Sequence, residues 1–227
     1  MGNRAIITTK KRDLGVYLHW NGGRDSVGAF LEYCELRGFR APDGDTYGWA
    51  RLCQVICNYM GAEGLSVGIS RYEGDARMDP GDNGIYVIEG WRIARRLTTE
   101  YGPGWEPAGM REVRPEEEQD VYPRAEMLRD IDAAQPEDQR LGAYLDAEEV
   151  PASGVVPGDE VFMRRVDGRF EAYPVAGIGH EGRLVNGLDI SGVPYVAMYG
   201  KDDAGWSANI NNYLRTPTVR RAPVRAI

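Results

Sequence analysis

The sequence lacks the residues on which several kinds of functional site depend. It contains two histidines and three cysteines among 227 residues. Cys34, Cys53 and Cys57 form neither a Cys-x-x-Cys pair nor a set with a convincing fourth ligand. We therefore expect no metal and no cofactor. Because the three cysteines fall on apolar stripes of expected helices, we expect reduced thiols that pack in the core.

Long apolar segments are also absent from the chain. No run approaches the roughly 18 residues that a transmembrane helix needs. The first 11 residues include bases, but the apolar segment that would complete a signal peptide does not follow them. These absences predict a cytoplasmic protein that has no membrane partner.

Basic charge is scarce, and the acidic excess is unevenly distributed. The 27 lysines and arginines face 35 aspartates and glutamates, which gives a net charge of −8. Residues 111–150 hold 13 acidic and 5 basic side chains, and the rest of the chain is nearly neutral. This balance argues against direct nucleic-acid binding. It indicates two near-neutral folded parts joined by an acidic connector.

The N-terminal part, residues 1–110, has the pattern of an α+β domain. Alternating apolar positions predict strands at residues 4–9, 15–20, 65–70, 84–89 and 91–97. Helical spacing predicts one helix that is capped by Asp25 or Ser26 and ends before Gly38, and a second helix at residues 46–60. This order predicts a mainly antiparallel sheet with both helices on one face.

The sequence also predicts two irregular stretches, an acidic connector and a C-terminal β-rich part. Two stretches rich in glycine, residues 71–83 and 101–111, are predicted to be irregular. Residues 111–150 are expected to form an exposed acidic connector with a helix at residues 122–134. Four or five short strands in residues 151–227 predict a small SH3-like β-barrel with an Arg- and Pro-rich tail.

A glycine turn between the second strand and the first helix is the candidate ligand site. Such a turn can direct backbone N–H groups and the positive end of a helix dipole at an anion. The candidate binding residues are His19, Asn21, Gly22, Gly23, Arg24 and Ser26. The segment is neither a Walker loop nor a dinucleotide fingerprint, and the alternative is an ordinary capped turn. No catalytic arrangement can be assigned around the histidine.

An acidic run within the connector is the candidate partner-binding segment. Its residues are Glu116, Glu117, Glu118 and Asp120. Acidic side chains can occupy a basic groove by charge mimicry, and the alternative is a solvated linker. The chain also has 13 tyrosines and 5 tryptophans against 4 phenylalanines. This excess is typical of interaction surfaces and favours a binding protein over an enzyme.

Five segments of the sequence resemble a family of small proteins encoded by phages, prophages and other mobile elements. They are RAIITT (4–9), GVYLHWNGGRDSV (15–27), YGWARLCQVI (47–56), DNGIY (82–86) and INNYLRT (210–216). Most members of the family have no assigned activity, and some proteins that look like the first domain are linked to inhibition of type II CRISPR nucleases. The resemblance implies an accessory role and supplies no catalytic residues.

The leading hypothesis from the sequence is a non-enzymatic, phage-type accessory protein that binds a host macromolecule, with a defence nuclease as the candidate partner. One alternative is a protein or enzyme that holds a nucleotide-like anion at residues 21–26. Another alternative is a virion or assembly component. The three hypotheses differ in the partner that they require, and the sequence leaves the choice open.

Overall fold

The computed structural model describes residues 2–61, 66–114, 117, 122–180, 184–185, 188–189, 193–202 and 205–223. The chain divides into two compact units, unit 1 (Met1–Glu137) and unit 2 (Asp138–Ile227). Sheets and a few helices make up the chain, which confirms the α+β class. The single division at residue 137 differs from the two expected boundaries at residues 110 and 150.

Unit 1 contains a six-stranded sheet in the order β3-β2-β1-β4-β5-β6. Its strands are β1 (Ala5–Thr9), β2 (Leu14–Leu18), β3 (Val67–Arg71), β4 (Ile85–Glu89), β5 (Arg92–Tyr101) and β6 (Pro107–Glu112). The central pair, β1 and β4, is parallel, and the other neighbours are antiparallel. The sheet is therefore mainly antiparallel around one parallel pair.

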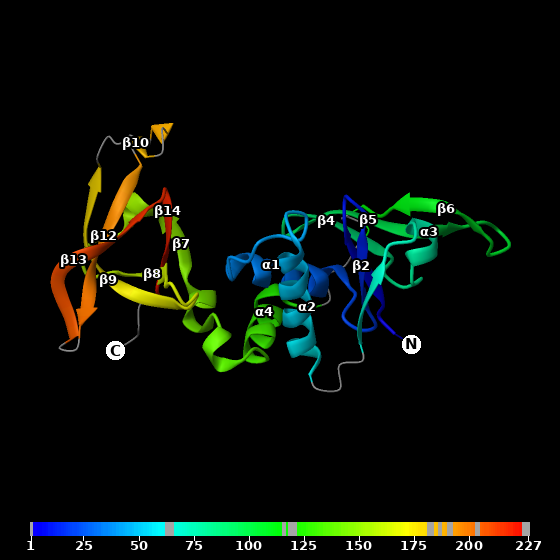
Figure 1. Ribbon diagram of the computed structural model, residues 1–227, viewed down its shortest axis with the longest axis horizontal. Helices are drawn as coiled ribbons and strands as arrows, with labels where there is room; N and C mark the ends of the chain where they lie inside the picture. Colours follow the sequence, from blue (N-terminus) through cyan, green and yellow to red (C-terminus); the bar gives the residue numbers. More distant parts are fainter. Residues whose placement is uncertain are drawn as a thin grey trace. The chain divides into compact units, whose positions relative to one another are not determined.

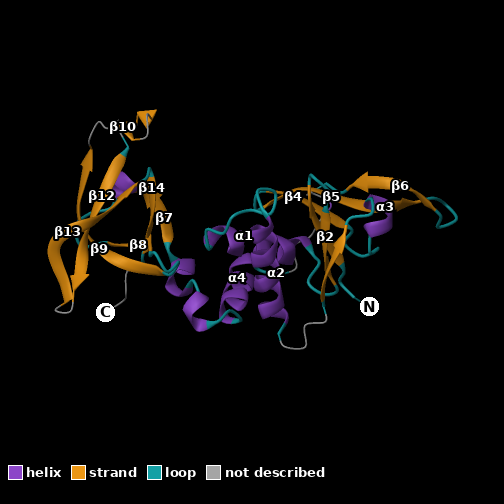
Figure 2. Ribbon diagram, viewed as in Figure 1, coloured by secondary structure: helices purple, strands orange, loops and turns teal. Residues whose placement is uncertain are grey.

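Three longer helices and one short helix accompany this sheet. They are α1 (Arg24–Leu36), α2 (Thr46–Met60), α3 (Asp75–Met78) and α4 (Arg124–Ala133). Figures 1 and 2 show α1, α2 and α4 gathered on one side of the sheet, and α3 on the other side near β5 and β6. All five residues of β1 are buried because both faces of the sheet centre are covered.

The two faces of the sheet hold different apolar groups. On the face near α3, one buried cluster consists of Ile6, Tyr72, Ile85, Val87 and Leu97. Alternation along β4 sends Tyr86 and Ile88 to the opposite face, and both are fully buried. Burial on both faces explains why β4 is a continuous apolar run rather than an alternating one.

The helix ends follow local sequence signals. The side chain of Asp45 accepts hydrogen bonds from the first N–H groups of α2, and Gly61, with φ of 78°, ends that helix. α1 begins at Arg24, with Gly23 in an extended conformation as its N-cap. The expectation that Asp25 or Ser26 caps α1 is therefore wrong, since both residues lie inside the first turn.

Two segments that were expected to be irregular contain regular structure. β5 continues to Tyr101 and pairs with β6, so most of residues 101–111 belongs to a hairpin. Gly102, Pro103 and Gly104 form its turn, while Pro107 and Gly109 lie within β6, where cross-strand pairing determines the structure. Within residues 71–83, the short α3 covers the sheet face beside Tyr72.

The expected exposed connector helix is instead part of unit 1. α4 packs against α1 and α2 and buries Met127, Leu128, Ile131 and Asp132. Asp132 accepts a buried hydrogen bond of 2.7 Å from the hydroxyl of Tyr33. The high acidic content of this segment concealed its apolar stripe, although the charged side chains of α4 other than Asp132 are exposed.

Unit 2 is β-rich. Its six-stranded sheet has the order β13-β12-β9-β8-β14-β7. The strands are β7 (Glu148–Pro151), β8 (Glu160–Arg164), β9 (Phe170–His180), β12 (Pro194–Asp202), β13 (Gly205–Arg215) and β14 (Thr218–Arg221); β10 (Leu184–Val185) and β11 (Leu188–Asp189) form a separate pair. Short 3-10 helices lie at Glu137–Gln139, Gly142–Asp146 and Ala152–Gly154.

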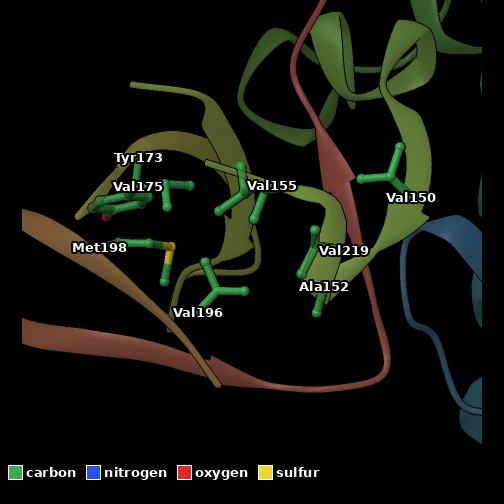
Figure 3. Close-up of a cluster of buried hydrophobic side chains, with 9 residues drawn as sticks. Val150, Ala152, Val155, Tyr173, Val175, Val196, Met198 and Val219 are labelled. Atoms are coloured by element: carbon green, nitrogen blue, oxygen red, sulfur yellow. The ribbon is translucent and has the colours of Figure 1, made fainter. Parts of the chain in front are cut away.

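One apolar cluster forms the core of unit 2. It consists of Val150, Ala152, Val155, Val161, Tyr173, Val175, Val196, Met198 and Val219, and Figure 3 shows these side chains directed toward one another from several strands. In the part of unit 2 that the structure describes, the strand pairings run from β13 to β7 without a pairing that closes the sheet.

Candidate functional site

A polar hollow at the N-terminus of α1 is the main candidate site in unit 1. Its volume is about 440 Å³. It is lined by Asn3, Asn21, Gly23, Arg24, Asp25, Ser26, Asn83, Arg96, Glu117 and Tyr122. Four residues of the predicted glycine-turn site line it, and so does one residue of the predicted acidic run. The structure thus brings together two candidate segments that the sequence placed far apart.

The glycine turn is attached to the N-terminal segment of the chain. Asn21 has a left-handed backbone with φ of 55°, and the N–H of Gly22 donates to the carbonyl of Asn3 at 2.8 Å. A Cβ atom on Gly22 would lie 2.5 Å from that same oxygen, so only glycine permits this close approach. Because its N–H already donates to Asn3, Gly22 cannot donate it to an anion. Gly22 is also not among the residues that line the hollow.

The helix N-terminus beside the hollow already has a carboxylate of the protein. Asp25 accepts from the N–H of Ser26 at 2.7 Å and from the N–H of Tyr122 at 3.0 Å. This carboxylate satisfies part of the positive end of the α1 dipole. The hollow carries two guanidinium groups, Arg24 and Arg96, against the carboxylates of Asp25 and Glu117. The formal charges of its lining residues therefore cancel.

The parallel pairing of β1 and β4 builds the other side of the hollow. Asn3 and Asn83 each precede one of these strands by two residues, so both lie at the same edge of the sheet. Asn83 donates to the side-chain oxygen of Asn3, and Arg96 donates to the carbonyl of Asn83 at 2.7 Å. No local sequence pattern indicates this junction, because only the strand topology joins Asn3 to Asn83, which lies 80 residues further along the chain.

An ion pair fixes the loop that carries Asn83. Arg4 donates two side-chain hydrogen bonds and its backbone N–H to the carboxylate of Asp82. These hydrogen bonds, the largest influence on the group, lower the pKa of Asp82 to about 2. The pair connects the start of β1 to the start of β4, directly beside the hollow.

We expect this ion pair to make stability depend on pH in the acid range. Because the pKa of Asp82 is lower in the folded state than in the unfolded state, the stabilisation is complete above pH ~4 and is lost as the pH falls toward 2. Urea unfolding of wild type and Asp82→Asn should give free energies that differ at pH 7 and converge near pH 2. A difference that stays constant over this range would contradict the role of the pair.

His19, the remaining residue of the predicted turn site, lies outside the hollow. Its Nδ1 atom is 2.9 Å from the hydroxyl of Tyr17, and its ring packs edge-on against Trp20 with centroids 5.0 Å apart. The ring is half-buried at the end of β2. The structure therefore separates the histidine from the other predicted binding residues.

The acidic run can be placed at one residue only. Glu117 is exposed, accepts from the Arg111 side chain at 2.8 Å and accepts from the N–H of Arg114 at 3.1 Å. The hydrogen bond from Arg111 lowers the pKa of Glu117. Glu116, Glu118 and Asp120 lie outside the described residues.

The tip of the β5–β6 hairpin presents a pair of aromatic side chains. Trp105 is 83 % exposed and Tyr101 is 49 % exposed, and their rings are in contact with centroids 6.3 Å apart. Trp105 has a left-handed backbone with φ of 64°, which is rare for a bulky residue. Figure 1 shows this hairpin extending beyond the neighbouring strands.

Backbone hydrogen bonds close the turn at the tip. The N–H of Gly102 donates to the carbonyl of Glu106 at 2.8 Å, and the N–H of Trp105 donates to the carbonyl of Gly102 at 3.0 Å. The indole is therefore presented on a closed turn rather than on an open loop. The sequence signal for this feature was a tryptophan within a glycine- and proline-rich turn.

The cysteines divide by position. Cys34 is buried, Cys53 is half-buried and Cys57 is exposed. Core packing therefore holds for Cys34 and is wrong for Cys57, because α2 buries Leu52, Val55 and Ile56 and turns Cys57 outward. Burial raises the pKa of Cys53 to about 11. Among the described residues, no group of three or more His, Cys, Asp or Glu side chains could hold a metal ion.

The chain thus combines an α+β unit, which carries a polar hollow and an aromatic hairpin tip, with a β-rich unit. No family model, curated protein or solved structure matches the chain. In the part of the chain that the structure describes, none of the helices combines the length and apolar character needed to span a bilayer.

Proposed function

We propose that the protein is a non-enzymatic accessory protein of the phage or mobile-element type, which binds a host macromolecule in the cytoplasm. The observation that carries this proposal is the exposed pair of Trp105 and Tyr101, whose rings are in contact at the hairpin tip. The family resemblance of the sequence supports the biological setting and makes a defence nuclease the candidate partner.

The physical argument concerns what these aromatic side chains do for the free protein. An indole that is 83 % exposed gives little apolar burial to unit 1. Its left-handed backbone adds a local conformational cost. Tryptophan and tyrosine are the residues that most often dominate the affinity of protein interfaces. A partner that buries the ring would supply the stabilisation that the free protein does not obtain.

We further propose that unit 2 is a small SH3-like barrel that provides a second contact surface. Its support is the set of short antiparallel strands around one apolar core. The acidic run at residues 116–120 is proposed to contribute charge complementarity toward a basic partner.

Capture of partners from host lysate tests the role of the hairpin tip. Purified wild type, Trp105→Ala and Trp20→Ala serve as baits, and captured proteins are quantified by mass spectrometry. Trp105→Ala should lose about 30-fold or more of partner affinity, since truncating a tryptophan hot spot costs about 2 kcal/mol or more. Its thermal stability should stay unchanged. Trp20, which is 44 % exposed beside His19, is the matched control.

The outcome that rejects the proposal is equal capture by wild type and Trp105→Ala, or loss with both tryptophan variants. A fourth bait, with the acids at residues 116–118 and 120 changed to amides, separates the contribution of charge. A DNA-cleavage assay with a purified type II CRISPR nuclease then tests the candidate partner directly. Undiminished cleavage in excess protein would exclude inhibition of that nuclease.

A further inference from the structure

The outer edge of β3 is an open sheet edge in unit 1. β3 ends the strand order of its sheet, and among the described residues no strand pairs with its outer side. The backbones of Ser66 and Tyr72 hydrogen-bond to the β2 side. Because hydrogen-bonding directions alternate along an antiparallel pair, the N–H and C=O groups of Val67, Ile69 and Arg71 point away from β2. These groups are therefore oriented toward a further strand.

Ile69 places an apolar side chain at the middle of this edge. It is 59 % exposed, and it lies opposite Val16 of β2, which is fully buried. The apolar layer of the sheet therefore continues past β2 to the edge instead of ending at β2. An exposed apolar side chain on a strand with open hydrogen-bonding groups favours pairing with another chain.

The opposite edge of the same sheet is protected against such pairing. β6 begins with Pro107, whose nitrogen cannot donate a hydrogen bond, and ends with the charged Arg111 and Glu112. A register shift also interrupts its pairing with β5. Prolines, charges and irregularities are the usual means of protecting an edge strand. β3 has only the charge of Arg71, at its end, so the two edges differ in their protection.

A second copy of β3 meets the requirements of this edge. When two copies lie antiparallel about a two-fold axis at Ile69, the two isoleucines are opposed, and Arg71 of each copy lies opposite Val67 of the other. The two arginines are then at opposite ends of the pair, roughly 13 Å apart along the strands. The aliphatic part of each arginine can cover the valine. A pair centred on Arg71 instead would oppose the two arginines directly, which is unfavourable.

We propose that the protein forms a two-fold symmetric dimer in which two β3 strands pair antiparallel, centred on Ile69. This pairing joins the sheets of two copies into one continuous sheet. The outward-facing residues of the two strands supply about six backbone hydrogen bonds. The surface lies on residues other than the hairpin tip, so the inference goes beyond the proposed function and does not depend on it.

The mass of the full chain in solution, measured against concentration, tests the dimer. Sedimentation equilibrium of wild type should show a reversible monomer–dimer equilibrium. Ile69→Lys should weaken dimerisation about tenfold or more, because it opposes two cations at the axis. Val156→Lys is the matched control, since Val156 is also 59 % exposed but lies in unit 2. This control and Trp105→Ala should dimerise as wild type does, which separates this surface from the proposed function.

Two further substitutions of Ile69 test the backbone pairing and its register. Ile69→Pro removes an N–H that points away from β2, so the fold should persist while the dimer, which loses two hydrogen bonds, weakens roughly tenfold. In a Cys57→Ser background, Ile69→Cys should form a disulfide with its own copy on mild oxidation, because opposed residues of a hydrogen-bonded pair have Cα atoms about 5.5 Å apart. Ser70→Cys, which this register places opposite Gly68, should not.

Three outcomes would overturn the proposal. The first is a wild-type chain that remains monomeric at every concentration, including one that takes up a β-strand peptide at this edge instead. The second is a dimer that Ile69→Lys and Ile69→Pro leave unchanged while circular dichroism shows both variants folded. The third is equal cross-linking of Ile69→Cys and Ser70→Cys, which would exclude the register centred on Ile69.

Discussion

Gly84→Ala is expected to destabilise unit 1 by about 3 kcal/mol or more, the largest effect of any single methyl addition that we predict. Gly84 has φ of 74°, and a Cβ atom there would overlap the carbonyl oxygen of Leu97 on β5. Its own carbonyl accepts the N–H of Ile6 at 2.9 Å. The residue thus lies where β1, β4 and β5 meet, so the clash cannot be relieved without separating strands.

Gly81→Ala is the matched control for this experiment. Gly81 also has a left-handed backbone, with φ of 87°, but an added Cβ atom would have no heavy atom within 4 Å. The Gly81→Ala variant should therefore lose only about 1 kcal/mol of stability, the cost of placing alanine in a left-handed backbone conformation. Urea unfolding followed by circular dichroism measures both. Equal losses in the two variants would show that the contact with Leu97 does not matter.

The helices of unit 1 were the elements that could be predicted best from the sequence. α2 has the predicted bounds because its signals are local: Asp45 accepts from its first N–H groups, and Gly61 ends it. The apolar stripe of α1 was also recognisable from its helical spacing, and Val27, Phe30 and Cys34 on that stripe are buried. Its start was misplaced, since an extended glycine without a side-chain cap gives no sequence signal.

The candidate site was predictable only on its glycine-turn side. Asn21, Gly23, Arg24 and Ser26 lie in one short segment, and they do line the hollow. Asn83 reaches the same place through parallel pairing of β1 with β4, which neither strand's own sequence specifies. The separation of His19 from the hollow follows from strand alternation and from its bond to Tyr17, two details that residue spacing does not contain.

The acidic segment shows how charge counting can conceal packing. Residues 111–150 were expected to lie outside both folded parts, yet α4 buries an apolar stripe against α1 and α2. Arg124 donates to Glu32 and to the carbonyl of Gly28 of α1. The buried side chain of Gln135 also donates to the carbonyl of Val55 in α2. Polar bonds thus add specificity to an apolar contact.

Ile131→Ala is expected to destabilise unit 1 by about 2–5 kcal/mol, because it leaves a cavity where a fully buried side chain stood. Ile131 is 0 % exposed and lies on the face of α4 that packs against α1 and α2. Unfolding monitored by urea denaturation measures the loss. If α4 were an exposed connector, the same substitution should change the free energy of unfolding by no more than ~0.5 kcal/mol.

Glu126→Ala is the control on the opposite side of the same helix. Glu126 is exposed in the first turn of α4, so its loss should cost no more than about 1 kcal/mol through the helix dipole. Hydrogen exchange adds a second measurement: amides of α4 should be protected as well as those of α1 in wild type, and Ile131→Ala should weaken both together. If Ile131→Ala weakened the protection of the α4 amides alone, α4 would not unfold cooperatively with α1, and unit 1 would not extend to Glu137 as a cooperative unit.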